Sequence, residues 1–398
     1  MPELDDLDPD SRAHSARLSA LIRDQIASNG GALPFWRFME LALYAPGLGY
    51  YSAGATKLGP DGDFVTSPEL GPLFAECVAD ALAPVLKPMG EDGRFLEIGG
   101  GSGAFAEAAI QRLDAVGAMP GRYAILEPSA DLRERQRRRL YERLPPPLFA
   151  HVEWPQMPIA SAWRGVVFAN EVIDALPTSR FAVIGGEIYE EHVAIDGDGF
   201  KRVDRPADAL LSAAVRHVER HCGGRFPEGF RSEVLPQLPY WMQAVIGGMS
   251  SGALLFVDYG YPRREYYDPR RNDGTLRAFH RHRLASDVFA RVGLQDLTVS
   301  VDFTAMAEAG TAAGFEFAGY CSQASFLIGN GLEQRLAERE AQAVGPHGAD
   351  EAARYALRQQ AKKLTLPGEM GERFQVIGFA RDAELDHAFL VGDLSFRL

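Results

Sequence analysis

The spacing of apolar positions predicts helices in the first part of the chain. Asn29-Gly30-Gly31 ends a segment in which four apolar residues recur on one helix face: Leu18, Leu21, Ile22 and Ile26. A second helix is predicted from Phe35 to Tyr44, directly after Pro34, and a third from about Pro72 to Val85. These segments predict a helical extension ahead of the main domain.

From Arg94 onward, short apolar runs alternate with segments of helical spacing. Seven runs have the length and composition of strands: 94–98, 122–127, 148–153, 165–170, 253–258, 314–320 and 374–380. Such alternation is typical of an α/β fold with a Rossmann-like, mostly parallel sheet. Ligands of such sheets bind beside the carboxyl ends of the strands. We therefore look for chemistry in the residues that follow each run.

The alternation is interrupted between the fourth and fifth predicted strands. Residues 181–195 have the pattern of a hairpin around Gly185-Gly186, and residues 205–248 have a largely helical pattern. We expect a helical insertion at 178–250 that covers a substrate. The expected domains are then 1–90, the extension with its loop, and 91–398, the α/β domain with the insertion.

A glycine cluster follows the first predicted strand and opens a helix. Gly99, Gly101 and Ala104 fit the dinucleotide pattern G-x-G-x-x-A, while Glu97, Gly99, Gly101 and Gly103 fit an acidic-x-G-x-G-x-G pattern found in S-adenosylmethionine (SAM) methyltransferases. Glycines let the backbone turn sharply and approach a ligand, and the helix start presents free N–H groups. A structural turn without a ligand has the same composition. The local pattern leaves SAM and NAD open.

Acidic and amide side chains follow two further strands. Glu127 ends the second strand, where a carboxylate can accept hydrogen bonds from ribose hydroxyls. Asn170, Glu171 and Asp174 follow the fourth, central strand, where the reacting end of a cofactor would lie. These acids can also simply cap a helix start. We take Glu171 and Asp174 as catalytic candidates, with Glu233 of the insertion as a third.

The loop from Gly59 to Leu70 is long for a connector and rich in Gly, Asp and Ser. We expect its part from Asp63 to Leu70 to close over the cofactor or the incoming substrate side chain, with Thr66 and Ser67 among the cofactor-binding residues. A solvated connector is the alternative.

Composition and charge indicate which partners, metal sites and cellular locations are expected for this protein. The net charge of −13 disfavours sequence-independent binding to nucleic acid. Cys77, Cys222 and Cys321 are widely spaced and predict neither disulfides nor a zinc site, and His280-Arg281-His282 lacks neighbouring acids, so we expect no metal.

No apolar run is long enough to span a bilayer, and the first ten residues are acidic, unlike a transit peptide. A bacterial cytoplasmic location is expected.

Several longer phrases together resemble the MidA family of class I SAM-dependent methyltransferases. They are Gly49-Tyr50-Tyr51, Gly62 to Leu70, the glycine loop, Ala169 to Pro177, Val257 to Gly260, Val301 to Thr304 and Leu366 to Gly371. The resemblance runs from about residue 16 to 382. A last strand reached through the helical tract 325–363 suits the methyltransferase sheet, in which a seventh strand inserts antiparallel beside the fifth.

This resemblance implies a SAM-dependent methyltransferase. In family terms, Gly99, Gly101, Gly103 and Glu127 match the cofactor positions, and we add Glu97 and Asn170. Mitochondrial members assist assembly of respiratory complex I by dimethylating an arginine on a core subunit, so the resemblance implies a protein substrate, with a complex I subunit as the first candidate. Two other functions are weighed: a SAM-binding assembly chaperone with little catalysis, and an NAD-linked oxidoreductase.

Overall fold

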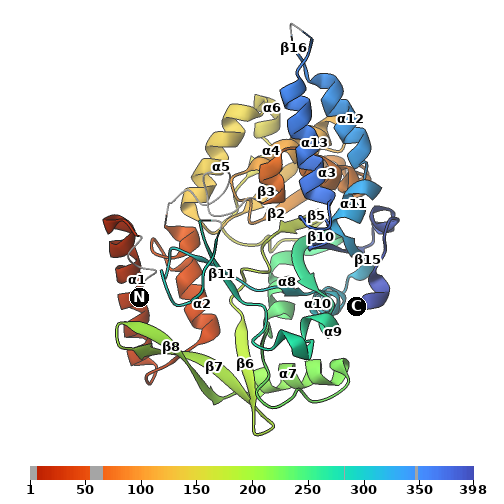
Figure 1. Cartoon of the computed structure of the whole chain (residues 1–398). Helices are drawn as coiled ribbons and strands as arrows, with labels where there is room; N and C mark the ends of the chain where they lie inside the picture. The colour runs from red at the N-terminus through yellow and green to blue at the C-terminus, as the bar shows by residue number, and fades with distance from the viewer. Residues whose placement is uncertain (1–6, 54–65, 282, 346–347) are drawn as a thin grey trace. The chain divides into compact units, whose positions relative to one another are not determined.

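A computed structural model describes residues 7–53, 66–281, 283–345 and 348–398 of the chain (Figure 1). The chain divides into two compact units. Unit 1 comprises Met1–Phe64, Ile173–Leu238 and Tyr261–Asp302, and unit 2 comprises Val65–Val172, Pro239–Gly260 and Phe303–Leu398. Each unit is described by itself.

Unit 2 contains a mostly parallel sheet with the strand order β15-β18-β10-β5-β2-β3-β4. Its strands are β2 (Gly93–Ile98), β3 (Arg122–Leu126), β4 (Val152–Glu153), β5 (Trp163–Asn170), β10 (Met249–Tyr261), β15 (Glu316–Ser322) and β18 (Phe374–Arg381). Strand β18 pairs antiparallel with both β10 and β15, while β10, β5, β2, β3 and β4 pair in parallel. The expected α/β class, the position of the last strand and its antiparallel direction are confirmed.

Helices of unit 2 pack on both faces of this sheet. On one face, apolar side chains of α3, α4, α5 and α11 form a core with Phe95, Val166 and Leu255 of the strands. On the other face, Trp241 of α8 contacts Phe256, and α10 packs on β15 and β18. The helices are α3 (Leu73–Leu86), α4 (Ala104–Ala115), α5 (Ala130–Arg143), α6 (Pro146–Phe149), α8 (Leu238–Ile246), α10 (Phe303–Ala312), α11 (Gln323–Gly329), α12 (Leu332–Gln342) and α13 (Glu351–Thr365), with the short pair β16 (Val344–Gly345) and β17 (Gly348–Ala349) before α13.

Unit 1 is built on an antiparallel sheet with the order β1-β7-β6-β9, in which β8 also pairs with β7. The hairpin predicted around Gly185-Gly186 is confirmed: both glycines have positive φ, 59° and 76°, and they join β6 to β7 as a two-residue turn requires. The strands are β1 (Leu33–Pro34), β6 (Ser179–Ile184), β7 (Glu187–Asp196), β8 (Gly199–Pro206) and β9 (Arg231–Val234), with β11 (Arg277–His280), β12 (Arg283–Leu284), β13 (Asp296–Thr298) and β14 (Val301–Asp302) following.

Two apolar clusters hold unit 1 together. One joins α1 and α2 to Val193, Ala278 and Leu297, and the other joins α7 to β6, Phe230 and Tyr267. The helices are α1 (Pro9–Ser28), α2 (Phe35–Tyr44), α7 (Ala209–Cys222) and α9 (Arg263–Tyr266). The first two match the predicted helices, since α1 ends at Asn29 and α2 has the expected bounds.

Two expectations about the chain's organisation differ from the structure. The insertion at 178–250 is not helical: it forms the four strands β6 to β9 as well as α7 and α8. The compact units also have bounds other than 1–90 and 91–398, because α3 packs in unit 2 whereas residues 261–302 join the N-terminal helices in unit 1. Such long-range packing leaves no local signal in the sequence.

Candidate functional site

The glycine loop follows β2 in unit 2, and its backbone requires glycine. Gly99, Gly101 and Gly103 have φ values of 69°, 54° and 83°, which other residues rarely adopt. The Gly99 N–H donates to the Leu126 carbonyl at the end of β3 (3.0 Å). A Cβ added to Gly99 would lie 2.8 Å from a methyl of Val172, which follows β5. The loop therefore lies against the ends of both neighbouring strands.

Glu97, near the end of β2, is a buried carboxyl with a neutral hydrogen-bond partner. Its side chain is 3% exposed and accepts a hydrogen bond from the Tyr123 hydroxyl (2.8 Å). Burial, and to a lesser extent the charge of Glu127, raises the pKa of Glu97 to about 8. Glu97 therefore carries a proton over much of the neutral range before any ligand binds.

Glu127 follows β3 and is also buried, at 5% exposure. One carboxylate oxygen accepts from the Ser129 N–H (2.9 Å) and the other from the Gln136 amide (3.3 Å). Burial raises the pKa of Glu127 to about 7, although these hydrogen bonds, the Arg133 guanidinium and the Gly101 N–H act in the opposite direction. The contact with Gly101 brings the predicted ribose acceptor to the glycine loop.

Asn170 and Glu171 follow the central strand β5. The Asn170 amide nitrogen donates to a Glu171 carboxylate oxygen (3.1 Å), whereas the Asn170 side-chain oxygen is buried without a hydrogen-bond partner among the described residues. Glu171 has φ 53°, unusual for a residue other than glycine, and its N–H donates to the Val257 carbonyl of β10 (2.9 Å). A left-handed residue at a strand end is a feature of functional sites.

Only part of the expected covering loop lies within the described residues. Residues 59–65 and His282 lie outside them. Thr66 precedes a short helical turn from Ser67 to Leu70. The Ser67 hydroxyl is fully buried and donates to the Gln323 side chain (3.0 Å), so it anchors this turn to α11.

The same turn is joined to the glycine loop. Ser102 donates a short hydrogen bond to the Glu69 carboxylate and accepts one from Arg139 of α5 (3.3 Å). Arg139 is held in turn by Glu107 of α4 (2.7 Å). These contacts fix the turn at the edge where the glycine loop lies.

The remaining two catalytic candidates belong to unit 1. Asp174 is buried there at 5% exposure, and its carbonyl accepts from the Val299 N–H (2.9 Å). The chain passes from unit 2 to unit 1 between Val172 and Ile173. Glu171 and Asp174, three positions apart in the sequence, are therefore held by different units.

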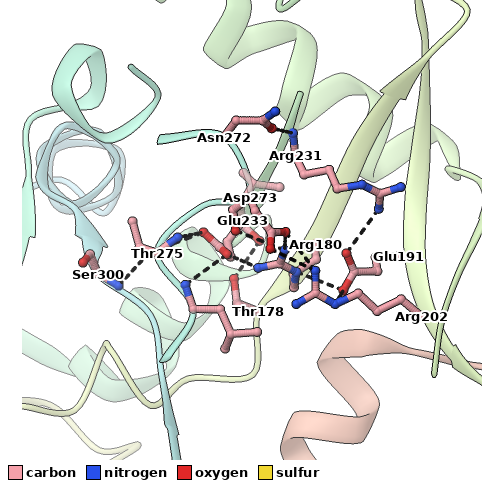
Figure 2. Close-up of polar contacts among 12 residues, drawn as sticks. Thr178, Arg180, Glu191, Arg202, Arg231, Glu233, Asn272, Asp273, Thr275 and Ser300 are labelled. Carbon is pink, nitrogen blue, oxygen red and sulfur yellow. Dashed lines mark hydrogen bonds and ion pairs between the residues drawn. The ribbon is translucent and has the colours of Figure 1, made fainter. Parts of the chain in front are cut away.

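Glu233 lies on β9, in the strands that replace part of the expected helical insertion, and it is enclosed by its own unit (Figure 2). Its carboxylate pairs with Arg180 and accepts from the backbone N–H groups of Thr275 (2.9 Å) and Leu276 (3.2 Å). A Cβ added to Gly274 would lie 2.3 Å from the Glu233 oxygens. These contacts occupy both carboxylate oxygens. Glu233 is therefore not an open carboxylate on a substrate-covering insertion, as we expected from the sequence.

Arg180 is the centre of this ionic network in unit 1 (Figure 2). It is 1% exposed and pairs with Glu191 (3.0 Å), Glu233 and Asp273 (2.6 Å). The guanidinium groups of Arg202 and Arg231 also lie beside the Glu191 carboxylate, each at 3.4 Å. Every carboxylate of the network therefore has a cation beside it.

Sequence reasoning missed the residues that hold the site in unit 2. Gln136 lies within an arginine-rich stretch of the sequence, yet it is fully buried. Its position four residues before the buried Leu140 was the available signal, because a polar residue on the apolar face of a helix needs a partner. Tyr123 and Trp154 carried no signal apart from lying in or near predicted strands.

Comparison with known proteins decides the class of this chain. A sequence model of a family of S-adenosyl-L-methionine-dependent methyltransferases matches residues 77–321. The chain belongs to this family. The cofactor of this methyltransferase is SAM, so the choice that the glycine pattern left open is settled against NAD.

Solved structures and curated relatives agree with this assignment. A superfamily member from Burkholderia thailandensis, solved with S-adenosyl-homocysteine bound, is 40% identical and has a TM-score of 0.89, with 98% of this chain and 99% of that chain covered. A native structure of a protein from the same organism is 39% identical, with a TM-score of 0.86 and the same coverage. The mitochondrial protein arginine methyltransferase NDUFAF7 homolog of Drosophila melanogaster is 26% identical over 92% of this chain and 86% of its own length, and human NDUFAF7 is 27% identical over 86% and 79%.

The residues of unit 2 fit SAM. The positive-φ glycines let the loop turn tightly so that its backbone can approach a ligand, and the unpartnered oxygen of Asn170 can accept a hydrogen bond from the amino group of the cofactor. Glu127 can accept from the ribose hydroxyls. No helix among the described residues of the methyltransferase is long and apolar enough to cross a bilayer.

Proposed function

We propose that this methyltransferase modifies an arginine side chain of a protein, and that a core subunit of respiratory complex I is the first target to test. The curated relatives that are named as protein arginine methyltransferases support the choice of arginine. The complex I target rests on the resemblance of the sequence motifs to the MidA family. We also propose that the enzyme acts in a bacterial cytoplasm.

The observation that carries the proposal is the position of Glu171. It follows the central strand, two residues before the chain leaves unit 2, and Val172 beside it lies against Gly99. The Asn170 amide holds one of its carboxylate oxygens, and its left-handed backbone turns the chain sharply there. Glu171 thus presents a charge beside the loop that we assign to the cofactor.

A carboxylate suits a guanidinium substrate. The guanidinium is planar, carries fixed N–H donors and stays protonated at neutral pH, so it is a poor nucleophile. A carboxylate that pairs with one side of the group orients it and localises its charge away from the attacking nitrogen. Bound SAM supplies an electrophilic methyl group, and the task of the chain is to hold the nitrogen in line with it and to exclude water.

Among the three catalytic candidates, Glu171 is therefore the first choice and Asp174 the second. Glu233 is not retained, because Arg180 and backbone N–H groups already satisfy its carboxylate. We assign the cofactor to Glu97, Gly99, Gly101, Gly103, Glu127 and Asn170. The buried hydroxyl of Ser67 anchors its own turn, so Thr66 remains the candidate from the covering loop.

The test is Glu171→Gln, which keeps the shape of the side chain and removes its charge. We expect unchanged affinity for S-adenosyl-homocysteine by calorimetry and loss of at least nine-tenths of methyl transfer to proteins from a strain that lacks this enzyme. Mass spectrometry then locates the lost methyl group. Asp174→Asn should have a smaller effect, and Glu134→Gln, an exposed change on α5, serves as the matched control.

Two outcomes would overturn the proposal. If Glu171→Gln loses cofactor affinity but turns over normally at saturating SAM, Glu171 is a cofactor ligand. If the wild-type enzyme binds SAM, transfers no methyl group to any protein and is still required for complex I assembly, a SAM-binding assembly chaperone is the better description.

A further inference from the structure

Gln136 of α5 connects two parts of the cofactor edge that are distant in the sequence. Its amide nitrogen donates to the Gly101 carbonyl of the glycine loop (2.9 Å) and to a Glu127 oxygen (3.3 Å). The side chain is fully buried, so these hydrogen bonds do not compete with water. One amide therefore holds the loop and the carboxylate in a single arrangement.

Trp154 fixes the direction of this amide. The indole N–H of Trp154 donates to the Gln136 side-chain oxygen (3.0 Å). An indole nitrogen only donates, so the oxygen of the amide must face Trp154 and its NH₂ group must face Gly101 and Glu127. The guanidinium of Arg137 lies over the Trp154 ring at 5.1 Å and packs against the indole from outside.

The glycine loop also rests on Gln136 sterically. A Cβ added to Gly100 would lie 3.1 Å from the Gln136 amide nitrogen, and one added to Gly103 would lie 3.4 Å from the Gln136 Cα. At Gly100 this approach is tighter than most side chains permit, and at Gly103 it is ordinary van der Waals contact. Gln136 thus contacts the loop both through a hydrogen bond and through packing.

We propose that Gln136, oriented by Trp154, is a positioning residue that holds Glu127 as a carboxylate aimed at the cofactor ribose. This inference rests on the proposed assignment of Glu127 as a cofactor ligand. It adds a residue that acts on the cofactor only through Glu127 and the glycine loop. It does not depend on arginine being the methyl acceptor.

The inference predicts how cofactor affinity depends on pH. Ribose hydroxyls donate to an ionised carboxylate, so affinity should fall as Glu127 takes up a proton below pH 7, where its pKa lies. The other charged groups at this site are Arg133 of α5, which favours the carboxylate of Glu127, and Glu97, whose own pKa is raised in part by the charge of Glu127. Because Gln136 donates to the charged form, its loss should raise the pKa of Glu127 further.

The experiment measures the affinity for S-adenosyl-homocysteine from pH 5.5 to pH 9 in the full-length enzyme. For each unit by which the pKa rises, Gln136→Leu should bind roughly tenfold more weakly than wild type at pH 6 and less than twofold more weakly at pH 9. Trp154→Phe should shift the profile in the same direction by less. Arg138→Leu, an exposed change on the same helix, is the control and should follow the wild-type profile.

A residue with a merely structural role would weaken binding equally at all pH values, so parallel profiles would overturn the inference. A flat wild-type profile would also overturn it, because Glu127 would then not bind as a carboxylate. If Gln136→Leu does not fold, the inference is tested by the pH profile of Trp154→Phe and by an NMR titration of the labelled Glu127 carboxyl. Methyl transfer to proteins is not measured here, so failure of this inference is separate from failure of the proposed function.

Discussion

Both units of this protein bury a pair of glutamates, and they treat them in opposite ways. In unit 1, Glu191 and Glu233 are 0% and 1% exposed and share the Arg180 guanidinium. In unit 2, Glu97 and Glu127 are 3% and 5% exposed and accept hydrogen bonds from neutral groups, although the Arg133 guanidinium also acts on Glu127. The pKa values of this second pair are raised to about 8 and 7.

The difference separates a structural ionic network from a binding site. A buried carboxylate with a cation beside it has its charge compensated within the protein, so it offers little to a ligand. A buried carboxylate whose hydrogen-bond donors are neutral keeps much of its desolvation cost, which a ligand with positive charge or donor groups can relieve. Burial of an acid is therefore not enough to identify a binding site. The charge of the groups that contact the acid distinguishes a binding site from a structural ion pair.

Loss of the Arg180 cation should destabilise unit 1 strongly. Arg180→Met leaves the buried carboxylates of Glu191 and Glu233 without the Arg180 guanidinium. This change should lower the free energy of unfolding by about 3–5 kcal/mol. Chemical denaturation measures this change. Arg270→Met removes an arginine from an exposed ion pair with Asp268 and should leave the unfolding midpoint unchanged. Equal effects of the two variants would mean that the buried network does not stabilise unit 1.

A second test separates backbone strain from ligand contact. Gly101→Val should abolish measurable binding of S-adenosyl-homocysteine, at least a hundredfold or about 3 kcal/mol, because a branched side chain is placed in the loop at a left-handed position. Gly185→Val is the matched control, since Gly185 has φ 59° and open space around its Cα in the hairpin of unit 1. Normal affinity in Gly101→Val would place the cofactor elsewhere.

The third test uses the protonation of Glu97. Because its folded pKa lies near 8, above its ordinary value of 4.5, the folded state holds the proton longer than the unfolded chain, and stability contributed by this group falls as the pH rises from about 4.5 to 8. Glu97→Gln removes this dependence and keeps an acceptor for Tyr123. Relative to wild type, the variant should gain roughly 1.4 kcal/mol for each pH unit between pH 5 and pH 8, or about 4 kcal/mol in all. A constant difference in denaturation midpoint would show that Glu97 is already ionised at pH 5.

The smallest expected effect concerns Glu127. Glu127→Ala should weaken binding of S-adenosyl-homocysteine at pH 8 by about 1–3 kcal/mol, the size of a lost hydrogen bond to a charged group. Calorimetry checks the loss, and Glu69→Ala, which removes a neighbouring acid that accepts a hydrogen bond from Ser102 of the loop, should lose less. Unchanged affinity in Glu127→Ala would remove it from the cofactor site.

Most of the methyltransferase sheet could be predicted from the sequence. The apolar runs of β2, β5 and β10 are buried on both faces, so they stand out locally, and Gly99 to Gly103 mark a turn that only glycine adopts. The acids that follow the strands could then be predicted as site candidates, because parallel strands bring their carboxyl ends to one edge of the sheet. The family motifs indicated SAM, which the comparisons confirmed.

Which buried acids have a cation beside their charge could not be predicted, because that depends on how the chain folds. Glu233 and Glu127 look alike in sequence, yet Glu233 faces Arg180, 53 positions away, whereas Glu127 faces Gln136 and the glycine loop. The division into units was equally hidden, since three separate stretches of chain form unit 1. The physical reason is that local patterns report burial and turn geometry, while the charge next to a buried group depends on residues that folding brings from elsewhere in the chain.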